Sequence, residues 1–97
     1  MSERNFKKFQ EDVSNWARVQ FPKETSEARI KKMRTELNEL EDEPYDGEEM
    51  ADIGLVLLNH AEKAGVDLYL EMQRKLEICK KRKWVETDSD GVYQHLK

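Results

Sequence analysis

"RTELNELEDEPYDGEEMADIGLVLLNHA", residues 34–61, joins an acidic segment to an apolar one. Eight carboxylates lie between Glu36 and Glu49, and a ninth, Asp52, falls inside the apolar segment. Because residues 51–61 are apolar nearly all round, they predict the most buried helix of a helical protein. An ionised carboxylate in such a helix needs a cation, a hydrogen-bond partner or a raised pKa. We therefore expect Asp52 to be buried beside a partner.

The flanking sequence indicates further helices on both sides. Apolar residues recur every three or four positions there, Pro22 ends the first run, and Asp67 is a suitable cap for the last. The tail, residues 85–97, shows no periodicity and a turn at Asp90-Gly91. The predicted fold class is all-α, a four-helix bundle with a short irregular C-terminal tail. The helices are expected over about 5–20, from 25 or 26 to the acidic loop around Pro44, and over about 47–65 and 68–84.

Length and charge narrow the class of protein. The 97 residues suit one domain spanning 1–97. A chain of this size buries only about 60–65 % of the surface that its unfolded form exposes, so partner chains would help to cover its apolar faces. The net charge of −4 argues against binding of a nucleic-acid polymer.

Nothing in the sequence predicts secretion or a membrane segment. Cys79 is the single cysteine, which leaves no internal disulfide, and no N-terminal stretch combines basic residues with an apolar run. The longest apolar-rich run, residues 53–58, is far shorter than the ~20 residues that span a bilayer. We expect a cytoplasmic protein.

The acidic segment contains two carboxylate pairs at helical spacing. Residues three apart share a helix face, which pairs Glu36 with Glu39 and Glu49 with Asp52. Four carboxylates without histidine or cysteine form an all-oxygen set that suits Mg²⁺ or Mn²⁺ better than Zn²⁺, and substrate phosphates usually complete a magnesium site. The residues alone leave two interpretations open, a metal site for phosphate chemistry and a solvated acidic face with one paired Asp. The other five acids of the segment are expected to be solvated.

A basic segment near the C-terminus complements the acids. Residues 74–83 carry six positive charges, which would help to neutralise a triphosphate or would simply stabilise the last turn of a helix.

Several stretches resemble one family. "ELNE" (36–39) and "EMAD" (49–52) resemble the ExxE and ExxD metal motif of the MazG-like all-α nucleoside triphosphate pyrophosphohydrolases. "KLEICKKRKW" (75–84) resembles the pattern that closes the last helix of that family, matched by Lys75, Arg82 and Trp84, whereas Cys79 stands where many relatives have Asn. "FQEDVSNWARVQFP", "AEKAGVDL" and "WVETDSDGVYQH" are similar to its dATP/dGTP pyrophosphohydrolase branch.

The resemblance implies hydrolysis of a purine deoxynucleoside triphosphate, dGTP or dATP, to the monophosphate and pyrophosphate. It implies two or three Mg²⁺ ions, replaceable by Mn²⁺, and a homodimer or homotetramer. Glu39 is the candidate general base. Lys75 and Arg82 are candidates for phosphate contacts, and they could reach the site from a neighbouring subunit. The metal ligands implied are Glu36, Glu39, Glu49 and Asp52.

Other residues carry weaker predictions. Trp16, Phe9 and Trp84 are large enough to stack on a base, although each also suits ordinary packing. Asn59 lies seven residues after Asp52 on the same face, where it would orient a metal-bound carboxylate or make a helix contact. Two alternative functions stay open, the same fold acting on dUTP or a damaged nucleotide, and a non-catalytic helical interaction module.

Overall fold

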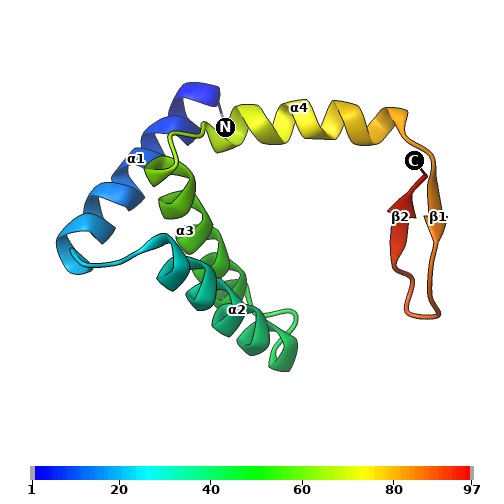
Figure 1. Cartoon of the computed structure of the whole chain (residues 1–97), viewed down its shortest axis with the longest axis horizontal. Coiled ribbons are helices and arrows are strands. Elements are labelled where there is room, and N and C mark those ends of the chain that lie inside the picture. Colours follow the sequence, from blue (N-terminus) through cyan, green and yellow to red (C-terminus); the bar gives the residue numbers. More distant parts are fainter. Residues whose placement is uncertain (1, 97) are drawn as a thin grey trace.

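The computed structural model describes residues 2–96, which form four helices followed by a β-hairpin (Figure 1). The four predicted helices are confirmed, although the last one ends before the expected Trp84. No helix among the described residues is both long and apolar enough to cross a membrane. The elements are α1 (Glu3–Gln20), α2 (Ser26–Asp42), α3 (Gly47–Lys63), α4 (Leu68–Lys81), β1 (Trp84–Glu86) and β2 (Tyr93–His95).

Local sequence sets the helix boundaries. The side chains of Thr25 and Asp67 accept hydrogen bonds from backbone amides in the first turns of α2 and α4. After α3, Gly65 adopts a φ of 72°, and the amide of Val66 donates to the carbonyl of Ala61 at 2.9 Å. This left-handed turn closes α3 near residue 65, where the sequence predicts the end of the helix.

Helix α3 is the centre of the fold, with α1 and α2 packed against it. Its buried residues, Leu58, Asn59 and Ala61, all lie in its C-terminal half. The N-terminal half is more open, and Asp52 is exposed, so the expectation that Asp52 is buried is wrong. A single chain encloses only the C-terminal half of this apolar helix. Hydrophobic periodicity shows that a helix has apolar faces, but it does not show how much of them one chain covers.

Helix α4 extends away from the other three helices (Figure 1). We call α4 and the hairpin after it, residues 68–96, the arm. Helix α4 has no buried residue, and the radius of gyration of 15.6 Å exceeds the about 13 Å typical of a compact chain of 100 residues. The chain therefore departs from a closed four-helix bundle. In a single subunit, α4 and the hairpin after it make few contacts with α1, α2 and α3.

One buried glutamine fixes the base of this arm. The side chain of Gln10 on α1 is fully buried, and its Nε2 atom donates to the carbonyl of Val66 at 2.7 Å and to Oε1 of Glu62 at 2.9 Å. Its Oε1 atom accepts from the amide of Leu68 at 3.2 Å. Gln10 thus ties α1 to the turn between α3 and α4.

The C-terminal tail is a β-hairpin, which corrects the expectation of an irregular segment. Strands β1 and β2 pair antiparallel, with Trp84 opposite His95. The predicted turn is present, because Gly91 has a φ of 85° and Oδ1 of Asp88 accepts from the amides of Asp90 and Val92. Strands of three residues are too short to show the alternation by which strands are recognised in a sequence.

Candidate active site

The two carboxylate pairs meet where α2 and α3 lie side by side. Glu36 and Glu39 come from α2, and Glu49 and Asp52 come from α3. Each of the four offers one oxygen, and these oxygens all lie within 4.8 Å of one another. Glu36 is buried, Glu49 is half-buried, and Glu39 and Asp52 are exposed. The short loop between the helices brings two motifs that are separate in the sequence to one point.

Two of these carboxyl groups have pKa values displaced in opposite directions. Lys32 donates to Oε1 of Glu36 at 2.8 Å, and this hydrogen bond lowers the pKa of Glu36 despite its burial. The same contact raises the pKa of Lys32. Desolvation, followed by the negative charge of Glu39, raises the pKa of Glu49. The cluster therefore holds more negative charge than its surroundings compensate.

The donor set fits a hard divalent cation. The Oε2 atoms of Glu36 and Glu49 are buried and have no hydrogen-bond partner among residues 2–96. Buried carboxylate oxygens without partners are costly, and a cation bound between them would remove both that cost and the mutual repulsion. An all-oxygen set of carboxylates is typical of Mg²⁺ and Mn²⁺ sites.

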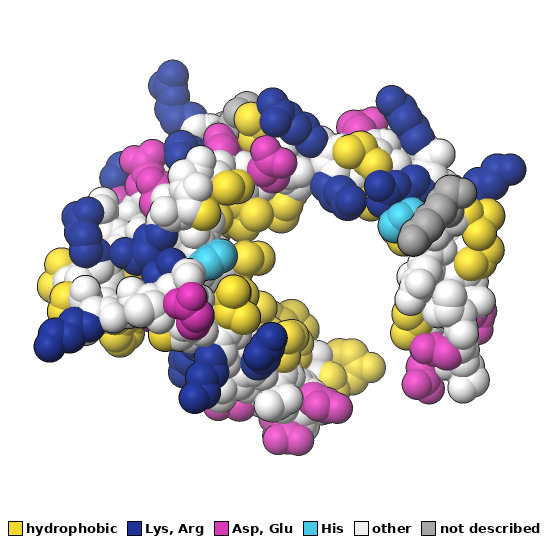
Figure 2. Space-filling model, in the orientation of Figure 1, with side chains coloured by type: hydrophobic (Ala, Val, Ile, Leu, Met, Phe, Trp, Pro, Cys, Tyr) yellow, Lys and Arg dark blue, Asp and Glu magenta, His cyan; other side chains and the backbone are white. Residues whose placement is uncertain are grey.

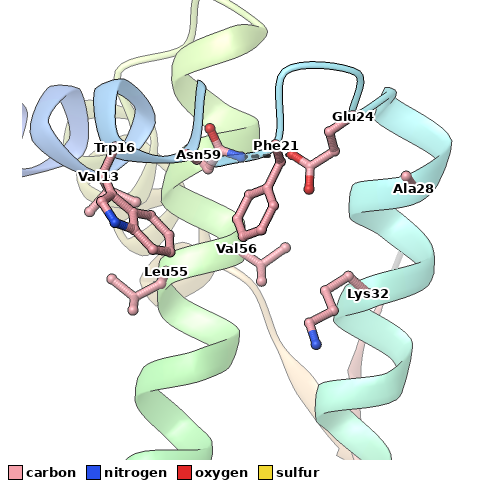
Figure 3. Close-up of a pocket in the computed structure, with 10 residues that line it drawn as sticks. Val13, Trp16, Phe21, Glu24, Ala28, Lys32, Leu55, Val56 and Asn59 are labelled. Atoms are coloured by element: carbon pink, nitrogen blue, oxygen red, sulfur yellow. Dashed lines mark hydrogen bonds between the residues drawn. The ribbon is translucent and has the colours of Figure 1, made fainter. Parts of the chain in front are cut away.

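A cavity of about 350 Å³ lies between α1, α2 and α3 (Figure 3), and Lys32 connects it to the cluster. Lys32 belongs to both, since its side chain lines the cavity and its amine reaches Glu36. The rings of Trp16 and Phe21 line the cavity as well, with centroids 5.5 Å apart and planes at 88°. A volume of this size and its aromatic walls suit a small organic ligand.

Two of the predicted contact residues, Trp16 and Asn59, line this cavity. Asn59 is buried and donates to Oε1 of Glu24 at 3.0 Å, so the structure does not show it orienting a carboxylate of the cluster. Phe9 lines a second cavity, which shares Val13, Trp16 and Leu55 with the first.

The remaining predicted contact residues lie on the arm. Arg82 follows α4 and has its Nη1 atom 3.4 Å from Nδ1 of His95. The indole of Trp84 donates to the carbonyl of Cys79 at 2.9 Å, which satisfies a group at the end of α4. Lys75 lies on α4 itself. Within one chain, the structure does not bring these three residues to the carboxylates (Figure 1).

The sequence alone did not indicate most of the cavity residues, among them Phe21, Glu24 and Lys32. Lys32 had a detectable signal, because it precedes Glu36 by four residues and such pairs meet on a helix. Phe21 and Glu24 lie in the connection between α1 and α2, where no periodicity indicates which side chains point inward.

The fold and the site define the class of protein. The structure superimposes with a TM-score of 0.82 on a cyanophage S-2L MazG-like pyrophosphohydrolase bound to dGDP and three catalytic Mn²⁺ ions per active site, a protein to which this chain is 26% identical. The match covers 100% of this chain and 99% of that one. The fold is thus that of the MazG-like all-α proteins, as the sequence predicted.

The sequence narrows that class to one family. The chain belongs to the dATP/dGTP pyrophosphohydrolase family, whose model matches residues 9–97. It is also 36% identical over 85 residues to a dATP/dGTP diphosphohydrolase of Salmonella phage PMBT28. That match covers 87% of this chain, which spans only 29% of the length of the phage protein.

Proposed function

We propose that this chain hydrolyses a purine deoxynucleoside triphosphate, dGTP or dATP, to the nucleoside monophosphate and pyrophosphate with the help of Mg²⁺. The observation that carries the proposal is the cluster of four carboxylate oxygens within 4.8 Å of one another, adjoining a cavity with aromatic walls. Membership of the dATP/dGTP pyrophosphohydrolase family supports the substrate class. The dGDP and Mn²⁺ ions bound by the cyanophage protein are consistent with both parts of the site.

Two or three Mg²⁺ ions, replaceable by Mn²⁺, would be held by Glu36, Glu39, Glu49 and Asp52. When bound, the ions would neutralise phosphate charge and make a water molecule more acidic. Glu36 and Glu49 would contribute the buried oxygens that now have no hydrogen-bond partner among the described residues. Glu39 and Asp52 are exposed and would complete the set from the solvent side.

The chain's own residues bind the substrate and accept the proton of the attacking water. The triphosphate lies against the carboxylate cluster, and the nucleoside lies in the adjoining cavity. Lys32, at the junction, contacts a phosphate oxygen through its amine. Glu39 takes the proton of the attacking water as the oxygen of that water bonds to the α-phosphorus. The bond from the α-phosphorus to the bridging oxygen breaks, and pyrophosphate leaves with that oxygen.

A second subunit completes the site in this proposal. Large apolar side chains are exposed on α3 and α4, among them Met50, Leu57, Met72 and Leu76. Figure 2 shows the chain curved round an open hollow with hydrophobic side chains along its inner edge. A homodimer or homotetramer would cover these surfaces and would bring Lys75 and Arg82 of a neighbouring subunit to the phosphates. Light scattering tests this, since a mass near 11.5 kDa would contradict it.

The activity is tested with the common nucleoside triphosphates and Mg²⁺, followed by separation of the products. We expect pyrophosphate from dGTP or dATP. A pyrimidine preference would indicate the alternative in which the fold acts on dUTP, and no pyrophosphate from any triphosphate would indicate a non-catalytic interaction module. The control changes acids of the neighbouring exposed segment, Glu41→Gln, Asp42→Asn and Glu43→Gln, and should leave the activity intact. Changing the four cluster carboxylates to amides should abolish it.

A further inference from the structure

The cavity has two chemically different ends. Asp52, in the carboxylate cluster, and Asn59, on the cavity wall, are seven residues apart on the same face of α3. This spacing places them about 10 Å apart along the helix axis. Leu55 and Val56 lie between them and also line the cavity. A nucleotide whose phosphates lie at the cluster would therefore extend its base toward Asn59.

The middle of the cavity suits a flat ring. Trp16 and Phe21 are each about half exposed, at 57% and 48%, and both line the cavity. Exposed aromatic rings beside a cavity offer the surfaces on which nucleobases stack. Aliphatic side chains form much of the rest of the wall, so the polar groups at the far end determine which base edge can be accepted.

The polar group at the far end is the carboxylate of Glu24. Its Oε1 atom accepts from Nδ2 of Asn59 at 3.0 Å and lies 3.7 Å from Nη1 of Arg29. No hydrogen bond to its Oε2 atom is found among residues 2–96, and Figure 3 shows this oxygen pointing into the gap between the Phe21 ring and helix α2, on the cavity wall. A hydrogen-bond acceptor therefore faces the cavity.

A buried network holds this carboxylate in place. The side chain of Arg29 is only 8% exposed, and its Nε atom donates to Nδ1 of His60 at 3.0 Å. The guanidinium compensates the charge of Glu24, and Asn59 fixes its direction. Such preorganisation makes a hydrogen-bonding group selective, because a ligand that cannot pair with it leaves the group desolvated and unpaired.

We propose that Glu24 selects guanine over adenine by accepting hydrogen bonds from N1–H and the 2-amino group of guanine. The inference rests on the proposed function, because it assumes that a nucleotide occupies the cavity. A carboxylate only accepts hydrogen bonds. Oε2 is available to one donor of guanine, and Oε1, which accepts from Asn59, keeps a second lone pair for the adjacent donor. Adenine presents an acceptor at N1 and no amino group at C2, so its edge repels the same carboxylate.

Binding calorimetry with the Mn²⁺-loaded protein and the diphosphates dGDP, dIDP and dADP tests this without requiring turnover. We expect Kd to be roughly 10- to 100-fold higher for dADP than for dGDP. We expect dIDP, which lacks only the 2-amino group, to bind roughly 10-fold more weakly than dGDP. Equal affinity of the wild-type protein for dGDP and dIDP, or no binding of any diphosphate, would overturn the proposal.

The informative variant is Glu24→Gln. An amide still accepts from Asn59 but offers the mixed donor and acceptor pair that matches adenine. The ratio of Kd for dADP to Kd for dGDP should fall at least about 10-fold, whereas the matched control Glu27→Gln, in the exposed first turn of α2, should leave it unchanged. If Glu24 had a purely structural role, or contacted the sugar, Glu24→Gln would raise Kd for both nucleotides by the same factor. That result would overturn the proposal. Pyrophosphate release, measured separately, reports on the proposed function alone.

Discussion

The amine of Lys32 lies 2.8 Å from Oε1 of Glu36, so a half-exposed cation reaches a carboxylate that is almost fully buried. The two residues are one helical turn apart on α2. This contact supplies positive charge to a cluster that otherwise contains only carboxylates. We infer that Lys32 partly serves, in the metal-free chain, the role that a divalent cation serves when bound.

Replacement of Lys32 should therefore destabilise the metal-free protein more than the metal-loaded one. Lys32→Met leaves Glu36 buried and without its donor, and because Lys32 is half exposed we expect a loss of only about 1 kcal/mol in the free energy of unfolding. Denaturant unfolding at a fixed protein concentration measures this with and without saturating Mn²⁺. The neighbouring variant Lys31→Met is the control, since Lys31 is exposed and has no ion pair in the described structure. An equal loss with and without Mn²⁺ would refute the inferred role.

Neutralising Glu49 should stabilise the metal-free protein and reduce the further stabilisation that Mn²⁺ provides. Burial and the charge of Glu39 raise the pKa of Glu49, so the folded chain disfavours its ionised form. Glu49→Gln should raise the melting temperature of the metal-free protein while reducing the further rise that Mn²⁺ causes. Differential scanning calorimetry measures both. A lower melting temperature without metal would show that Glu49 stabilises the fold through its charge.

The raised pKa of Glu49 also predicts how stability depends on pH. At neutral pH the ionised Glu49 destabilises the fold, and this effect disappears as the pH falls through its raised pKa toward the ordinary value of 4.5. The stability difference between Glu49→Gln and the wild-type protein should therefore shrink over that window. The affinity for Mn²⁺ should decrease over the same window, because protons compete with the ion. A stability difference that is constant with pH would contradict the assignment.

Ionised Glu36 should stabilise the fold, unlike ionised Glu49, because the hydrogen bond from Lys32 lowers the pKa of Glu36. Its contribution to stability is present above about 4.5 and is lost as the pH falls through the lowered value. Glu36 titrates both in the wild-type protein and in Glu49→Gln, so the difference between the two proteins reports mainly on Glu49.

Loss of Gln10 should weaken the attachment of the arm. Gln10→Ala removes the partner of two partly buried backbone groups, the carbonyl of Val66 and the amide of Leu68. We therefore expect a loss of about 2–4 kcal/mol in the free energy of unfolding. Gln73→Ala, at an exposed position on α4, is the matched control and should change stability little. Chemical denaturation at matched concentrations distinguishes the two. Equal stabilities would show that the buried hydrogen bonds of Gln10 are unimportant.

The helices and the carboxylate pairs were predictable because each depends on residues close together in the sequence. Capping at Asp67, the break at Gly65 and the three-residue spacing of Glu36 and Glu39 are local features. The exposure of Asp52 and the extension of α4 were not predictable, since both depend on how much of the apolar surface one chain encloses. Glu24 was missed for a related reason. The role proposed for it depends on Asn59 and Arg29, which the fold brings to it from α3 and α2.

The site of water attack is tested by hydrolysis of dGTP in ¹⁸O-labelled water with Mg²⁺, with the label located in the products by mass spectrometry. Attack on the α-phosphorus beside the carboxylate cluster predicts one ¹⁸O atom in dGMP and none in pyrophosphate. The variant in which Glu36, Glu39, Glu49 and Asp52 are all changed to amides should release neither product. Label in the pyrophosphate, or release of pyrophosphate by that variant at the wild-type rate, would contradict the account.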